Sequence, residues 1–216
     1  GYGKRPSALV GNLRMSLTPA SLLRYGYVLL LAAWLAGCAL QPPVDISGEP
    51  DRALQARLAA IDHWNLDGKL AVRSPQQAES ARVQWQQDGE GFDIRLSGPA
   101  GLKATRIYGM PGGVRFEQGE RRDSAGSAEV LSERLIGWPL PATELVWWLR
   151  GLPATNNDTH AITYTAEGWL ARLEQGDWTI RFSDHRPVQD VVLPGRIEAV
   201  RGELKITLVI KAWELP

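Results

Sequence analysis

The stretch Asn65-Leu-Asp-Gly-Lys-Leu-Ala-Val-Arg73 decides the fold, because its aliphatic side chains recur at every second position. In an extended chain Leu66, Leu70 and Val72 point to one side, and the charged side chains between them point to the other. This alternation is typical of an antiparallel strand that is buried on one face and wet on the other. The stretch therefore predicts a sheet with one apolar face.

The same two-residue period recurs along much of the chain. It appears in 81–86 and, after an Asp88-Gly89 turn, in 92–97. Further strands are expected over 102–109, 114–118, 121–124, 161–165, 169–174, 178–183, 195–200 and 203–213, separated by turns rich in glycine and proline. About ten or eleven such strands predict a large antiparallel sheet that curls.

Three short segments show helical spacing instead. They cover 51–63, where Asp51 can cap the first turn, 128–136, which Gly137 ends, and 144–150, which follows Pro139 and Pro141. So few short helices are expected to cover the concave face of the sheet. The predicted fold is mostly β with α: a curled antiparallel sheet forming an unclosed half-barrel of about eleven strands, covered by a lid of short helices. Such a body can enclose an apolar cavity.

The N-terminal region has the features of a secretory signal, with basic residues, an apolar run and then Leu35-Ala36-Gly37-Cys38. That ending resembles a bacterial lipobox, in which the cysteine is lipidated. The apolar run 28–40 is too short for a membrane span, which needs about 20 residues. We therefore expect a signal peptide over 1–37, with 1–14 as extra sequence upstream of Met15, a lipidated tether over 38–50 that starts at Cys38, and a single domain over 51–216.

The composition argues against several function classes. Once the signal is removed, 20 basic and 24 acidic side chains leave a net charge of −4. A mildly acidic domain without a Lys/Arg cluster is a poor candidate for binding nucleic acid. It is equally poor for purely electrostatic docking to anionic lipid.

The residues do not converge on a catalytic site. Cys38 is the only cysteine, and its lipidation leaves no disulfide, no cysteine metal site and no thiol nucleophile. The three histidines lack the spacing of a metal site, although zinc held by His63, His160 and His185 stays an alternative. The sequence contains no Gly-x-Ser-x-Gly elbow and no phosphate-binding loop. We expect a binding protein, not an enzyme, with no cofactor and no metal beyond the covalent lipid.

The aromatic residues have two interpretations. Eight tryptophans follow Cys38, and each can bury a large ring while keeping one N–H donor. Such rings either fix the short helices to the sheet or line and gate a lipid cavity, and both roles are compatible. The candidates for cavity and lid are Trp85, Phe92, Ile94, Leu135, Ile136, Trp138, Leu145, Trp148, Leu149 and Trp169.

The segment Pro99-Ala100-Gly101-Leu102 is also open to two interpretations. It is either an ordinary strand connection or an apolar tip that dips into a bilayer. One or two apolar residues would contribute about 1–3 kcal/mol each, which is enough for a transient contact and too little for anchoring.

Several short motifs are specific as an ordered set. They are the lipobox, Trp64 to Gly68, Trp85-Gln86-Gln87, Phe92 to Leu96, Ser97 to Gly101, Leu135 to Pro141, Trp147 to Pro153, Gly168-Trp169, Leu193-Pro194 and the final strand with Trp213. Together they resemble the LolB family of outer-membrane lipoproteins over 38–216. The resemblance implies a half-barrel with a helical lid, similar to LolA.

The resemblance also implies a function. The protein would accept triacylated lipoproteins from a LolA-like periplasmic carrier and insert them into the outer membrane, acting as a monomer. The membrane-inserting residue of the family falls at Ala100, and the larger Leu102 could take its role. Ala39 stands where aspartate would signal inner-membrane retention, so outer-membrane sorting is expected. The alternatives are a general lipid-binding lipoprotein and an envelope hydrolase.

Overall fold

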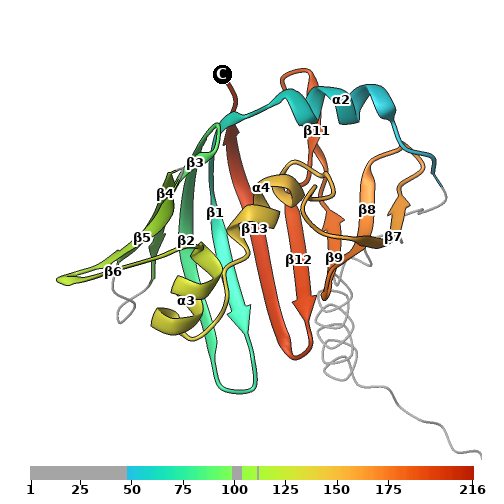
Figure 1. Ribbon diagram of the computed structural model, residues 1–216. Coiled ribbons are helices and arrows are strands. Elements are labelled where there is room, and N and C mark those ends of the chain that lie inside the picture. Colours follow the sequence, from blue (N-terminus) through green and yellow to red (C-terminus); the bar gives the residue numbers. More distant parts are fainter. Residues whose placement is uncertain (1–47, 99–103, 111) are drawn as a thin grey trace, which may run out of the picture. The chain divides into compact units, whose positions relative to one another are not determined.

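The computed structural model describes residues 48–98, 104–110 and 112–216. In this part of the chain, eleven antiparallel strands form one sheet that bends around two helices (Figure 1). Their order across the sheet is β6 (Arg121–Ala125), β5 (Gly113–Gln118), β4 (Thr105–Met110), β3 (Gly91–Ser97), β2 (Ala78–Asp88), β1 (His63–Arg73), β13 (Leu204–Glu214), β12 (Arg196–Arg201), β9 (Trp178–Ser183), β8 (Leu170–Gln175) and β7 (Thr159–Tyr164). Because β6 and β7 stand at opposite ends of this order, the sheet is unclosed, and the predicted fold class is confirmed.

The helices are α2 (Arg52–Ala60), α3 (Ala128–Ile136) and α4 (Ala142–Leu149). As predicted, Asp51 caps α2: its Oδ1 accepts from the Leu54 N–H at 2.9 Å. Gly137 ends α3 in the left-handed conformation, with φ 82°. The predicted end of α2 at residue 63 was wrong, since β1 already begins at His63 and buries Trp64.

A second, two-stranded sheet was not predicted. It consists of β10 (Arg186–Val188) and β11 (Val191–Leu193), in a region that the turn residues had marked as a connection. Val191 and Leu193 are buried with Leu54 and Leu58 of α2 and with Leu152, in a cluster separate from the main core. α2 therefore packs mainly in this second cluster, and α3 and α4 form the lid over the sheet.

The two-residue period of β1 sets the register of the central strands. Leu66 lies opposite Trp85 on β2, and Leu70 lies between Ala81 of β2 and Leu208 of β13. All five side chains are buried in the main core. The register with β13 shifts at Gly68, where a Cβ atom would lie 2.5 Å from the carbonyl oxygen of Val209, so this irregularity requires glycine.

One buried glutamine fastens α4 to the sheet. Gln175 of β8 is fully buried, and its Oε1 accepts from Trp148 Nε1 at 3.0 Å and from the Ala154 N–H at 2.8 Å. Its Nε2 donates to the Ala154 carbonyl at 2.7 Å, to the Asn157 carbonyl at 3.1 Å and to Thr159 Oγ1 at 3.0 Å. One side chain therefore satisfies polar groups of α4, of the loop after it and of β7.

Replacing this side chain should destabilise the domain. We expect Gln175→Leu to lower the free energy of unfolding by about 3–4 kcal/mol, because several buried donors and acceptors would lose their partners at once. Gln84→Leu, on an exposed position of β2, should change it by less than about 0.5 kcal/mol. Urea denaturation followed by tryptophan fluorescence measures both. Equal losses in the two variants would contradict the anchoring role of Gln175.

Candidate functional site

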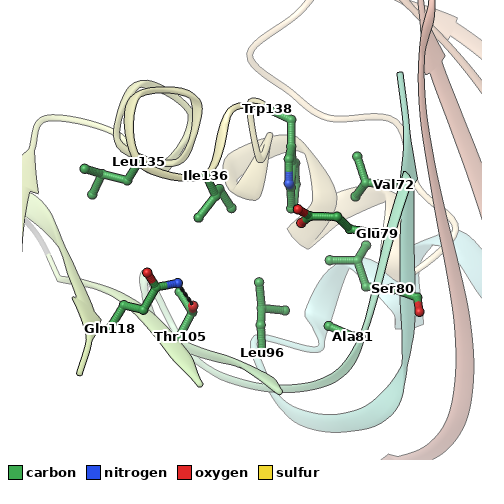
Figure 2. A pocket seen from close by; sticks show the side chains of 11 residues that line it. Val72, Glu79, Ser80, Ala81, Leu96, Thr105, Gln118, Leu135, Ile136 and Trp138 are labelled. Atoms are coloured by element: carbon green, nitrogen blue, oxygen red, sulfur yellow. Dashed lines mark hydrogen bonds between the residues drawn. The ribbon is translucent and has the colours of Figure 1, made fainter. Parts of the chain in front are cut away.

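A cavity of about 410 Å³ lies between α3 and the inner face of the sheet (Figure 2). The sheet supplies Leu70 and Val72 of β1, Glu79, Ser80 and Ala81 of β2, Leu96 of β3, Thr105 of β4 and Gln118 of β5, and the lid supplies Leu135, Ile136 and Trp138. Among these strand residues, Ser80 falls on the outward side of the alternation in β2. The volume is in the usual range of small-molecule sites, and most of the lining is aliphatic or aromatic.

Strand alternation explains the aliphatic part of the lining. Leu70, Val72, Ala81 and Leu96 fall on the inner side of their strands and are buried. They remain within reach of a ligand because α3 ends above them at Ile136.

The turn after α3 positions Trp138. Gly137 reverses the chain in the left-handed conformation, and Ser132 Oγ accepts from the Leu140 N–H at 2.7 Å. This bond holds the segment after α3 against the helix, so the indole of Trp138 lies at the cavity wall (Figure 2).

The polar part of the cavity lining comes mainly from Glu79, Ser80, Thr105 and Gln118. Gln118 Nε2 donates to Thr105 Oγ1 at 2.8 Å, and the Glu79 side chain is exposed at the rim. The Nε1–H of Trp138 is buried and finds no acceptor among the described residues. Among the described lining residues, these groups do not pair a nucleophile with a base.

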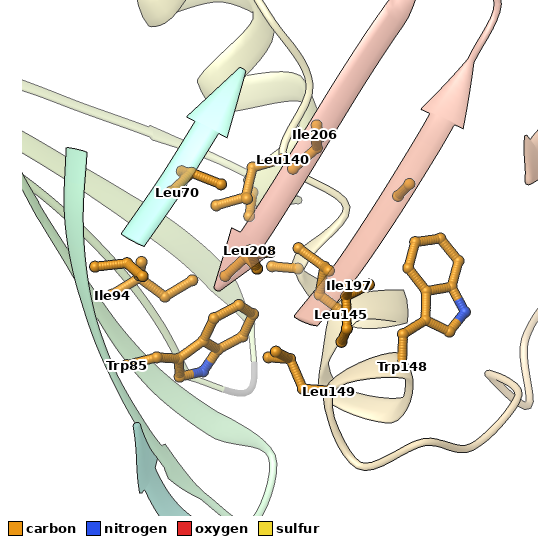
Figure 3. Packing of buried hydrophobic residues seen from close by; sticks show 14 of the residues in the cluster. Leu70, Trp85, Ile94, Leu140, Leu145, Trp148, Leu149, Ile197, Ile206 and Leu208 are labelled. Atoms are coloured by element: carbon orange, nitrogen blue, oxygen red, sulfur yellow. The ribbon is translucent and has the colours of Figure 1, made fainter. Parts of the chain in front are cut away.

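The predicted cavity residues divide into three groups. Leu135, Ile136 and Trp138 line the cavity. Six others pack in the main core beside it: Trp85, Phe92, Ile94, Leu145, Trp148 and Leu149. Trp169 packs against the second cluster instead, with its ring centroid 5.3 Å from that of His185. Figure 3 shows why the middle of the inner face is closed, since Leu145 and Leu149 of α4 reach toward Trp85 and Leu208.

The sequence reasoning missed part of the lining. It assigned Leu70, Val72, Ala81 and Leu96 to the buried face but not to the cavity, and it did not single out Glu79, Ser80, Thr105 or Gln118. The two-residue alternation of inward and outward side chains could have identified all of these residues except Ser80. It identifies every inward residue but cannot tell which ones the helices leave uncovered.

Two predicted functional elements, Cys38 and the loop Pro99–Leu102, lie outside the described residues, as does the signal peptide. The structure does describe the residues that flank the loop. Leu96 and Thr105 are paired in register between β3 and β4, and both line the cavity. The two strands that this segment joins in the sequence therefore reach the border of the cavity.

Charged side chains gather on the outer face of the sheet. Asp93 lies between Arg95 and Arg106, with N–O distances of 3.0 and 2.7 Å. Partial burial is the largest single influence and acts to raise the pKa of Asp93, but the hydrogen bonds and positive charges of Arg106 and Arg95 together outweigh it, so the pKa lies below its ordinary value. Strand alternation puts these residues opposite to Ile94 and Ile107, which face the core.

A buried arginine joins α4 to α2. Arg150 is 4 % exposed, and its Nη1 donates to the carbonyl oxygens of Leu58 and Ile61 at the end of α2. Burial lowers the pKa of Arg150 below its ordinary value. This cation lies among the carbonyls that end a helix, a favourable place for positive charge, and it is not part of the cavity lining.

Within the described ranges, no three or more His, Cys, Asp or Glu side chains come together in a way that could hold a metal ion. The helices of the same ranges are all too short or too polar to cross a membrane.

Comparison with known proteins points to one family. The family model for the outer membrane lipoprotein LolB matches residues 62–213. An outer-membrane lipoprotein LolB from Cellvibrio japonicus is 40% identical over 196 residues, covering 87% of this chain and 94% of the relative. The LolB of Stutzerimonas stutzeri is 40% identical over 200 residues, covering 90% and 97%.

A solved structure supports the fold independently. The crystal structure of a LolA superfamily protein from Nitrosomonas europaea matches with a TM-score of 0.50 at 12% identity, covering 76% of this chain and 93% of that one. At this identity the likeness concerns the fold alone. With the family match over residues 62–213 and relatives at 40% identity, the chain belongs to the LolB family of outer membrane lipoproteins.

Proposed function

We propose that this protein is a lipoprotein receptor of the outer membrane and not an enzyme. It accepts triacylated lipoproteins from a LolA-like periplasmic carrier into the cavity beneath α3 and inserts them into the membrane. The observation that carries the proposal is an open cavity with an aliphatic and aromatic wall, whose border includes Leu96 and Thr105, the residues that flank the Pro99–Leu102 segment.

The free energy of acyl transfer supports a carrier of this kind. Each methylene group moved out of water contributes about 0.8 kcal/mol, so three long chains cannot cross an aqueous space unshielded. Transfer without ATP requires each acceptor to bind the chains more favourably than its donor does. A cavity that recognises chains through aliphatic contacts, with few polar contacts, fits an intermediate position between carrier and bilayer.

The anchoring part of the proposal concerns Cys38 and the tether. We propose that Cys38 carries the covalent lipid and that the domain follows a tether over 38–50. At the end of this segment, the Gly48 N–H donates to the Tyr164 carbonyl of β7 at 3.3 Å, and the Asp51 N–H donates to Gly168 at 3.1 Å. A Cβ atom at Gly48 would lie 1.6 Å from the Thr165 carbonyl oxygen, so this contact requires glycine.

This contact limits the reach of the proposed anchor. With Gly48 held on the sheet, the nine residues 39–47 separate the lipidated cysteine from the folded body. Fully extended, they span at most about 30 Å. The domain, acting as a monomer, would stay close to the periplasmic side of the outer membrane while meeting the carrier.

The loop at the border of the cavity is the proposed exit. Chains that leave over Leu96 and Thr105, at the end of the β3–β4 pair, would pass the Pro99–Leu102 segment, and an apolar tip there would bring the opening to the bilayer. We propose Leu102 as the contacting residue, with Ala100 as the smaller alternative.

Depletion of the protein tests the function in cells. We expect lipoproteins to accumulate on the periplasmic carrier and to be lost from outer-membrane fractions, as measured by fractionation and immunoblotting. Re-expression of the protein should restore delivery. Normal delivery during depletion, with phospholipid but no carrier bound to the purified protein, would instead favour a general lipid-binding lipoprotein.

A charged residue at position 102 tests whether this segment takes part in the release of cargo. We expect Leu102→Glu to slow insertion of a lipoprotein into liposomes by about fivefold to 100-fold while leaving acceptance from the carrier unchanged, because a buried leucine contributes about 1–3 kcal/mol. Val200→Glu adds the same charge at an exposed apolar position of β12 and serves as the control. If both variants insert cargo at the unmodified rate, Leu102 has no part in the mechanism.

A further inference from the structure

The indole of Trp138 offers a hydrogen-bond donor at the wall of the cavity. The residue is 3 % exposed, and its Nε1–H has no acceptor among the described residues. Figure 2 shows the indole ring beside the hollow that Ile136 and Leu96 border. Because an unpaired buried donor is costly, its presence at a ligand cavity calls for an acceptor.

The N–H groups of other buried tryptophans provide a comparison. Trp85 Nε1 donates to Gln87 Oε1 at 3.0 Å, and Trp148 Nε1 donates to Gln175 Oε1 at 3.0 Å. Trp64 and Trp213 also have unpaired Nε1 atoms, but neither lines this cavity. Trp138 differs from all four because its unpaired N–H belongs to a residue that lines the cavity.

The neighbouring polar groups leave this donor to a ligand. Gln118 and Thr105 bond to each other at 2.8 Å. Glu79 also lines the cavity, but its side chain is exposed at the rim and is not bonded to Trp138. The remaining lining near Trp138 is aliphatic, from Leu135, Ile136 and Val72. The site therefore combines one neutral donor with an apolar wall.

We infer that the Trp138 N–H binds the carbonyl oxygen of an acyl ester or amide, the polar end of a hydrocarbon chain that the cavity holds. The inference rests on the proposed function and names the chemical group that this site recognises. An acyl carbonyl is a neutral acceptor, so it can enter an apolar cavity without the cost of burying a charge. One hydrogen bond at the end of a chain would set how deeply the chain enters, which aliphatic contacts alone cannot do.

Binding of a matched pair of lipids tests this inference. The probes are dioctanoylglycerol and its ether analogue dioctylglycerol, which differ in their carbonyl groups, and affinity is measured by displacement of the dye bis-ANS. We expect the protein to bind the ester about three- to tenfold more tightly than the ether, as one hydrogen bond would provide. Trp138→Phe, which keeps an aromatic ring but removes the N–H, should weaken binding of the ester alone and abolish the preference.

A control variant sharpens the result. Trp169→Phe changes a tryptophan of the second cluster, which does not line the cavity. It should keep the preference for the ester. Loss of the preference in Trp169→Phe, or its persistence in Trp138→Phe, would overturn the assignment to Trp138.

Infrared spectroscopy keeps the test decisive if Trp138→Phe does not fold. The stretching band of a ¹³C-labelled ester carbonyl should lie at lower frequency when bound to the unmodified protein than in an apolar solvent, because a hydrogen bond weakens the C=O bond. An unshifted band, or equal binding of ester and ether, would overturn the inference but leave the proposed function intact. Binding of neither lipid would overturn both.

Discussion

The inner face of the eleven-stranded sheet must be kept from water, and two helices of nine and eight residues do most of this work. α4 fills the middle, where Leu145, Trp148 and Leu149 are fully buried against the sheet. α3 covers the side near β4 and β5 less completely, and the cavity lies there. The site is thus a consequence of a mismatch between a large apolar face and a small lid. A closed barrel or a longer helix would remove that space.

Buried polar side chains hold the lid in place. Gln175 bonds to Trp148 and to the loop after α4, and Arg150 bonds to the carbonyls at the end of α2. Such bonds are directional, so they determine where α4 lies more narrowly than apolar contacts can. The charged side chains on the outer face leave the inner face apolar. Polar side chains thus fix the positions of the helices, and aliphatic side chains are left to form the binding site.

Local patterns were sufficient to predict the fold but only part of the site. The alternation that begins at Leu66 identified the strands and their buried face, and the turn residues separated them, so the unclosed sheet followed. The β10–β11 pair was not predicted because a strand of three residues is too short to show an alternation of apolar and polar side chains. Whether an inward side chain becomes core, as Trp85 does, or cavity wall, as Leu96 does, depends on where the helices end. Gly137 encodes the end of α3 locally, but the position of α4 over the sheet is set by long-range bonds such as those of Gln175, which no local pattern encodes.

The central claim is that acyl chains of the cargo occupy the space between α3 and the sheet. Its most direct test places a photo-crosslinking amino acid at Leu96, in the cavity wall, or at Gln84, on the outer face, and mixes each variant with carrier loaded with a lipoprotein bearing radiolabelled acyl chains. The account predicts label crosslinked to the protein from position 96 and none above background from position 84. Equal crosslinking from both positions, or none from position 96 while transfer proceeds, would contradict it.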